Sequence, residues 1–271
     1  MYLSLTAWSL PSCTLREAAD ISKALGIGAL DVGLFYRSAL DKALILSDPA
    51  AAAAPLADLG VRLPNYYHLF GDDLAGRNLA DPLTRRENLK DFAQVLKFAD
   101  AAGVGSVFVL PGVVNPGQSR REAFATSVDS LRALQDLASN HAATLCIEAH
   151  VHSFAESPEI VGELVEATGV RLALDYSHLA CLGYRQDEID PLASHAAHVH
   201  LRQARMGALQ TKFAHGTLNF PAMFGTLRDA GYDGALAIEP VHQDYMNTLY
   251  EDVLTEIVAL RDCYNDWRGA T

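Results

Sequence analysis

Short apolar segments alternate with longer amphipathic segments along the whole chain, and this alternation restricts the folds that the chain can adopt. The apolar segments predict eight strands, at residues 2–8, 28–33, 61–67, 106–110, 144–148, 170–175, 197–201 and 235–239. Strands that alternate with helices pair in parallel through helical crossovers. Because the strands are continuous apolar runs, we expect helices to cover both faces of the sheet.

The segments between the strands carry the signals that begin and end helices. Thr14 is followed three residues later by Glu17, which is the pattern of a capping box, and Gly26 is a stop signal. The segments predict helices at residues 14–25, 49–59, 82–102, 157–168, 220–230 and 245–267, a further helix that starts near 118–120, and a shorter one within 187–195.

The length of the chain fits one closed barrel of alternating strands and helices. Its 271 residues are close to the ~250 that are typical of an eightfold barrel, and no Pro/Ser-rich linker divides them. We therefore predict an α/β fold, a single (β/α)₈ TIM barrel with a parallel eight-stranded core, as one domain over residues 1–271. The alternative is an open doubly wound sheet, which is disfavoured because no G-x-G-x-x-G motif follows the first strand.

Charge and composition argue against several classes of protein. Half of the residues are apolar, which supports a sizeable core, and the net charge of -12 disfavours a nucleic-acid partner. No apolar run approaches the ~20 residues of a membrane helix. The four cysteines show no C-x-x-C spacing, and no basic segment precedes an apolar one near residue 1. These features favour a cytoplasmic protein with reduced thiols.

Each of the last four predicted strands ends in a carboxylate or an imidazole. The residues are Glu148, Asp175, His200 and Glu239. In a closed parallel barrel the carboxyl ends of all strands meet on one face, where active sites lie. Three carboxylates and one imidazole crowded together repel one another and raise one another's pKa values, and a divalent cation removes that cost. The alternative is that each residue only caps its strand or pairs locally.

The types of these side chains indicate which cation they would bind. Three carboxylates with one nitrogen suit a hard or borderline metal. We expect Mn²⁺ or Mg²⁺ first, with Mn²⁺ favoured, and Co²⁺ or Zn²⁺ as further options. We expect no organic cofactor.

Motifs around these positions resemble those of a known family. They are Ile-Glu148-Ala-His150, Leu-Asp175-Tyr-Ser-His178, His198-Val-His200-Leu, Gly216-Thr-Leu-Asn-Phe220, Gly231-Tyr-Asp-Gly234 and Ile-Glu239-Pro240, with Trp8, Ala24-Leu-Gly26 and Asp31-Val-Gly33 earlier in the chain. On these residues the chain resembles the xylose-isomerase-like TIM-barrel superfamily over nearly its whole length. That superfamily includes sugar phosphate isomerases, ketose 3-epimerases, inosose dehydratases and the endonuclease IV group.

The resemblance implies a metal-dependent isomerase or epimerase of a small sugar, a ketose or a polyol ketone. The four strand-end residues match the metal ligands of the epimerase branch, and Glu148 and Glu239 also match its acid/base pair. A metal that chelates a ketose through its carbonyl and a neighbouring hydroxyl acidifies the intervening C–H and stabilises the enediolate. Two glutamates can then remove and return the proton on different faces of that carbon. The resemblance also implies a homodimer or homotetramer.

Further residues are candidates for contact with a carbohydrate substrate, and they are His178, Arg205, His150 and Trp8. His178 matches a substrate-binding histidine of the family, and its alternative role is structural. Arg205 is a better candidate than Arg202 for binding a substrate oxygen or carboxylate. Trp8 forms an apolar wall over the sugar or packs in the core. His198 lies two residues before His200, on the same side of the strand and one layer deeper, which favours a supporting role over ligation.

Three other functions are weighed against the isomerase. A lyase or dehydratase uses the same metal and bases, so the ligands alone do not separate the two. A DNA repair endonuclease of this superfamily needs a trinuclear zinc cluster, but the fourth strand ends Val-Leu110-Pro111 without a histidine, and no aspartate lies two residues before His215. A barrel that only binds a ligand is disfavoured because all four ligand types are present.

Overall fold

Eight parallel strands close into a barrel in the order of the sequence, β1 to β8. The computed structural model describes residues 1–35, 38–241 and 252–270. The strands are β1 (Tyr2–Thr6), β2 (Leu30–Gly33), β3 (Asn65–Tyr67), β4 (Ser106–Val109), β5 (Thr144–Ile147), β6 (Arg171–Asp175), β7 (Ala196–Leu201) and β8 (Ala235–Ile238). Every predicted strand is present within a few residues of its expected limits, and the closed barrel confirms the predicted fold.

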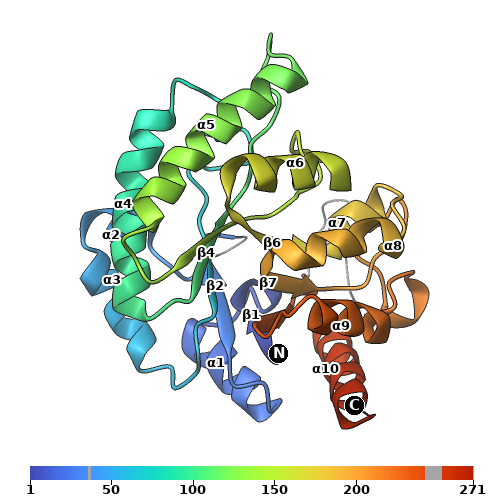
Figure 1. The fold of residues 1–271 in the computed structure, drawn as a ribbon. Helices are drawn as coiled ribbons and strands as arrows, with labels where there is room; N and C mark the ends of the chain where they lie inside the picture. The colour runs from blue at the N-terminus through green and yellow to red at the C-terminus, as the bar shows by residue number, and fades with distance from the viewer. Residues whose placement is uncertain (36–37, 242–251, 271) are drawn as a thin grey trace.

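Helices surround the barrel on the outside, as Figure 1 shows. They are α1 (Leu15–Ala24), α2 (Lys42–Ser47), α3 (Pro49–Ala57), α4 (Arg85–Ala102), α5 (Arg120–Ala138), α6 (Pro158–Thr168), α7 (Tyr176–Cys181), α8 (Gln186–Ile189), α9 (Phe220–Asp229) and α10 (Val253–Ala270), with short 3₁₀ turns at Ala7–Ser9, Asp190–His195 and Phe213–His215. Among the described residues, no helix is both long and apolar enough to span a membrane.

Local signals explain where the helices begin. The side chain of Thr14 accepts a hydrogen bond from the backbone N–H of Glu17, and the Glu17 carboxylate accepts one in return, which completes the predicted capping box of α1. The sequence did not indicate α2 or α7, which have six residues each and are too short to show helical periodicity. The predicted helix at 245–267 begins in residues that lie outside the described ones, and α10 runs from Val253.

The main apolar core lies between the strands and the surrounding helices. Leu3 and Leu5 of β1 are buried members of this core. The side chains of Ser4 and Thr6 alternate with them and point into the barrel, because successive residues of a strand face opposite sides. The interior receives polar groups, since Ser4 Oγ donates a hydrogen bond to Asp31 of β2. The barrel therefore places its main apolar core outside, while its interior holds polar groups together with a smaller apolar cluster that includes Trp8, Tyr67 and Phe108.

Candidate functional site

The four strand-end residues lie at the carboxyl ends of β5 to β8. Asp175 is the last residue of β6 and pairs in register with His200 of β7. Glu148 follows β5 directly, and Glu239 follows β8. The backbone N–H of Glu239 donates to the carbonyl of Leu201 at 2.9 Å, so hydrogen bonding between the strands continues to the ligand position. Rigid strands thus position all four side chains.

The closed barrel brings these side chains together. Each of these residues offers one atom that can bind a metal, and the four atoms all lie within 4.8 Å of one another. The residues are Glu148, Asp175, His200 and Glu239, and all four are buried. Nδ1 of His200 lies 2.6 Å from Oε1 of Glu148 and 3.8 Å from Oε2 of Glu239. We call these four residues the ligand cluster.

The ligand cluster fits a divalent cation by its charge and by its donor atoms. It holds three carboxylates in a buried space, and Oε2 of Glu239 has no hydrogen-bond partner among the described residues. A buried hydrogen-bond acceptor that lacks a partner lowers the stability of the folded protein. Three oxygen ligands with one imidazole nitrogen suit Mn²⁺, Mg²⁺ or Zn²⁺.

The pKa values of the cluster reflect the crowding of its carboxylates. Burial raises the pKa of Glu148 to about 7, with a smaller contribution from the charge of Glu239. Burial alone lowers the pKa of His200, but the charges of Glu239 and Glu148 outweigh burial and raise this pKa to about 10. The cluster by itself therefore holds protons near neutral pH, and a cation that binds there displaces them.

Arg202 lies beside the ligand cluster and neutralises part of its charge. Its Nη2 lies 2.6 Å from Oδ2 of Asp175 and 3.6 Å from Oε2 of Glu239, and its Nε donates to Oγ of Ser177 at 2.7 Å. Strand alternation would have found Arg202, because it lies two residues after His200 and so on the same side. Arg205 is exposed in a turn, where its N–H bonds to the carbonyl of Ala208, and the structure does not bring it to the cluster.

Two further histidines stand next to the cluster. His178 lies in α7, three residues after Asp175, and its Nε2 is 3.5 Å from Oδ2 of that residue. The ring of His150 packs against that of His178 with a centroid distance of 4.2 Å. Burial lowers the pKa of His150 to about 4 and the pKa of His178 well below its usual value. Both imidazoles are therefore neutral at pH 7. Nδ1 of each ring contacts the backbone of Val151, at 2.6 Å for His150 and 3.1 Å for His178, so Nε2 is the nitrogen that can exchange hydrogen bonds with a hydroxyl group.

An open cavity lies at the cluster, and its lining combines polar groups with aromatic rings. It is lined by Glu148, His150, His178, Arg202, Glu239, Trp8, Phe35, Tyr67 and Phe108. Trp8 follows β1, Glu239 follows the neighbouring strand β8, and Nε1 of Trp8 donates to Oε1 of Glu239 at 2.7 Å. Rings that face polar groups suit a ligand with both apolar C–H surfaces and hydroxyls, as a sugar has.

The structure brings together seven of the eight residues that the sequence singled out. They are Glu148, Asp175, His200, Glu239, His178, His150 and Trp8. The exception is Arg205. The sequence reasoning ranked Arg202 below Arg205, whereas the structure places Arg202 in the cavity. It did not single out Phe35, Tyr67 and Phe108, because single aromatic residues near strand ends look the same as core residues in a sequence.

A comparison with protein-family models identifies the family. The xylose isomerase-like TIM barrel model matches residues 16–260. The chain belongs to this family. Among curated proteins, 2-oxo-tetronate isomerase of Pectobacterium atrosepticum is 24% identical over 165 residues, which span 55% of this chain and 60% of that protein. The chain thus matches less than two thirds of that relative.

Solved structures of the same fold superpose over nearly the whole chain. The IOLI protein with a bound zinc atom matches with a TM-score of 0.76 and 17% identity, covering 98% of this chain and 99% of the other. D-psicose 3-epimerase in the presence of D-fructose matches with a TM-score of 0.72 and 16% identity, covering 99% and 98%. At such identities these matches show the shared fold.

Proposed function

We propose that this protein is an enzyme that isomerises or epimerises a small sugar, a ketose or a polyol ketone, with a divalent cation held by the ligand cluster. The observation that carries the proposal is the set of three buried carboxylates and one imidazole at the carboxyl end of the barrel, directly below a cavity with polar and aromatic walls. The names of the relatives, an isomerase and an epimerase, support the class of reaction, and the zinc atom of the IOLI protein supports a cation.

The residues of the cluster divide into two roles in this proposal. Asp175 and His200 only hold the cation, and Arg202 and Ser177 bind the carboxylate of Asp175. Glu148 and Glu239 hold the cation and also transfer protons. A divalent cation at this place supplies positive charge that stabilises negative charge on the oxygens of a substrate. We favour Mn²⁺, with Mg²⁺, Co²⁺ or Zn²⁺ as further options.

Glu148 and Glu239 act as base and acid on the carbon next to the substrate carbonyl. They stand on strands β5 and β8, which β6 and β7 separate, so they approach the cavity from different directions. One carboxylate removes the proton, and the other returns a proton to the same carbon or to its neighbour.

The remaining residues of the cavity bind the substrate and exclude water. The neutral imidazoles of His150 and His178 exchange hydrogen bonds with hydroxyl groups, and Arg202 donates to an oxygen. Trp8 and the stacked rings of Tyr67 and Phe108, 4.5 Å apart, cover the apolar face of the sugar.

A panel of ketoses, inososes and sugar acids, incubated with the purified protein and Mn²⁺ in heavy water, tests the proposal by NMR. We expect deuterium at the carbon next to the carbonyl together with an isomeric or epimeric product of unchanged skeleton. Loss of water, seen as an enone or a diketone, would indicate a lyase instead. No exchange with any compound, together with no bound metal after loading with Mn²⁺, would refute the proposal.

A further inference from the structure

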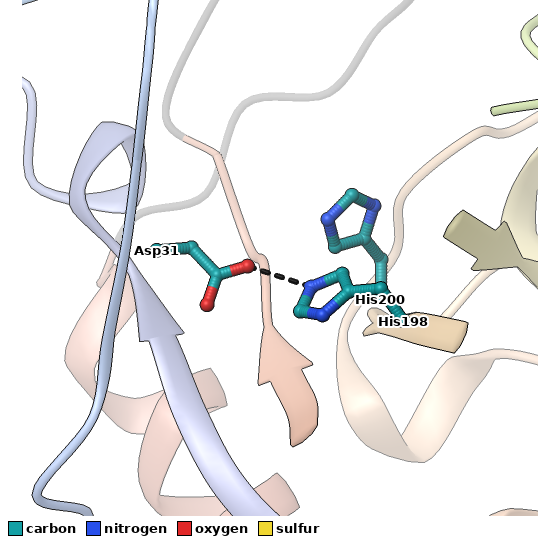
Figure 2. A group of neighbouring side chains, drawn as sticks. All are labelled: Asp31, His198 and His200. Carbon is teal, nitrogen blue, oxygen red and sulfur yellow. Dashed lines mark ion pairs between the residues drawn. The ribbon is translucent and has the colours of Figure 1, made fainter. Parts of the chain in front are cut away.

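A second group of polar side chains lies inside the barrel, one layer below the ligand cluster. Asp31 stands on β2 and His198 on β7, and β1 and β8 lie between those strands in the closed barrel. Nε2 of His198 lies 2.6 Å from Oδ2 of Asp31, and the two side chains are 1% and 0% exposed. Ser4 Oγ donates to Oδ1 of Asp31 at 2.5 Å. The pair thus spans the interior of the barrel, as Figure 2 shows.

His200 connects this pair to the ligand cluster, because its two ring nitrogens face different groups. Nδ1 faces Glu148, while Nε2 is buried and has no hydrogen-bond partner among the described residues. In Figure 2 the ring of His200 lies above that of His198, with Nε2 on the side of Asp31. Asp31, His198 and His200 each have one carboxylate oxygen or ring nitrogen that lies within 4.8 Å of the corresponding atoms of the other two residues.

This arrangement suits the tautomer that cation binding requires. A neutral imidazole that binds a cation through Nδ1 carries its proton on Nε2. The carboxylate of Asp31 lies on the Nε2 side, and in a buried space of low dielectric constant it stabilises a proton there. The ring of His198, held by Asp31, meets the ring of His200 edge to face at a centroid distance of 5.0 Å and so restricts its rotation.

The charge of this second group, Asp31 with His198, argues against a second cation site. Asp31 is its one carboxylate; the His198 imidazole lies 2.6 Å from one oxygen of that carboxylate, and the Ser4 hydroxyl donates to the other. The ligand cluster, in contrast, holds three carboxylates. A second cation would also need both ring nitrogens of His200 as ligands, so that this side chain would lose both of its protons.

We propose that Asp31 and His198 form a positioning pair that holds His200 in the orientation and tautomer needed to bind the cation. The proposal rests on the proposed function, because it assumes that His200 is a ligand. The pair does not touch the substrate, and it acts through His200.

Titration calorimetry with Mn²⁺ on the full chain tests the positioning pair, with the variants Asp31→Asn and His198→Gln. Each removes one member of the pair and leaves the ligand cluster intact. We expect binding about 10- to 100-fold weaker than wild type, which is usual when a partner of a metal-binding histidine is lost. The Co²⁺-loaded variants should also differ from wild type in their visible absorption bands, which report ligand geometry.

Two kinds of control separate positioning from a loss of folding. Asp100→Asn and His141→Gln break a histidine–carboxylate pair of 2.7 Å that lies ahead of β5, at the opposite end of the barrel, and should bind Mn²⁺ as wild type does. Thermal melting in EDTA checks that each variant folds. Ser4→Ala keeps both members of the pair and removes one hydrogen bond to Asp31, so it should fold and weaken Mn²⁺ binding by roughly two- to fivefold.

Three outcomes would overturn the positioning pair. The first is wild-type affinity in folded Asp31→Asn and His198→Gln, or, where neither folds, in Ser4→Ala. The second is two Mn²⁺ ions per wild-type chain with one lost in Asp31→Asn, because Asp31 would then be a ligand. The third is a wild-type protein that binds none of Mn²⁺, Mg²⁺, Co²⁺ and Zn²⁺, which also removes the cation from the proposed function, whereas the first two refute the positioning pair alone.

Discussion

The indole Nε1 of Trp8 donates a hydrogen bond to Oε1 of Glu239 over 2.7 Å, from strand end to strand end. Trp8→Phe keeps an aromatic wall but removes the donor that orients the carboxylate. Hydrogen bonds to charged groups contribute about 1.5–3 kcal/mol, so we expect kcat to fall by about 10- to 100-fold. Steady-state kinetics on the substrate found in the panel measures this, with Trp267→Phe, a change in α10 outside the cavity, as the control. Equal rates for both variants would show that the bond has no role in turnover.

Glu148→Gln and Glu239→Gln should each abolish most of the turnover. Glutamine keeps the shape of the side chain but cannot accept the substrate proton, and loss of a general base typically costs about 10²- to 10⁴-fold in rate. Turnover and metal content are measured together, because both residues also belong to the ligand cluster. Glu159→Gln, at an exposed position of α6, is the matched control. Near-normal activity in either cluster variant would mean that the assignment of two bases is wrong.

Arg202 and Arg205 lie three residues apart, and we expect only the replacement of Arg202 by methionine to change the stability of the protein. Arg202→Met leaves the buried carboxylate of Asp175 without its ion pair, and breaking a buried pair costs about 3–5 kcal/mol. Arg205→Met removes an exposed side chain and should change neither stability nor turnover. Urea unfolding and kinetics of both variants check this. A loss of activity confined to Arg205→Met would identify the exposed arginine as the one that contacts the substrate.

His68 should make the fold less stable in mild acid. Burial, with smaller contributions from Lys42 and Arg77, lowers its pKa from 6.5 to about 3. The unfolded chain therefore takes up a proton on His68 near pH 6.5, whereas the folded protein does so only near pH 3. Stability is fully present above pH 6.5, and it falls by up to about 1.4 kcal/mol per pH unit as the pH drops toward 3.

The variant His68→Asn isolates this contribution to stability. Asparagine can still accept the hydrogen bond that Tyr66 shares with Nδ1 of His68 at 3.1 Å, but it does not titrate. Urea unfolding between pH 4 and pH 7 should give a shallower loss of stability for this variant than for wild type. His152→Asn replaces an exposed histidine and should keep the wild-type slope. Identical slopes in all three proteins would show that His68 does not carry the effect.

The fold was predictable because its strands and helices leave separate patterns in the sequence. Apolar runs such as 144–148 and 235–239 mark strands, and Gly169 and Gly103 end helices at residues whose positive φ favours glycine. The six-residue helix α7 was not predictable from periodicity, because its first turn depends on the Asp175 side chain, which accepts a hydrogen bond from the N–H of Ser177.

The candidate site was predictable at positions where an ionisable residue directly follows an apolar strand. Glu148 and Glu239 follow apolar strands directly, so the sequence places them at the active face. Contacts between distant parts of the sequence were not predictable in the same way. The pair of Asp31 and His198 joins strands that are not neighbours, and the bond from Trp8 to Glu239 joins residues 231 positions apart. Such contacts depend on how the barrel closes, and no local pattern encodes that closure.

The outer position of the apolar core has a consequence for how this protein can change over generations. Leu3 and Leu5 stabilise the fold from outside the barrel, while Ser4, between them, faces the interior. Substitutions at inward positions therefore alter the chemistry of the cavity without removing the packing that holds strands to helices. Selection for a new substrate acts mainly on the inward residues of a strand, and selection for the packing of strands against helices acts on the outward residues that alternate with them.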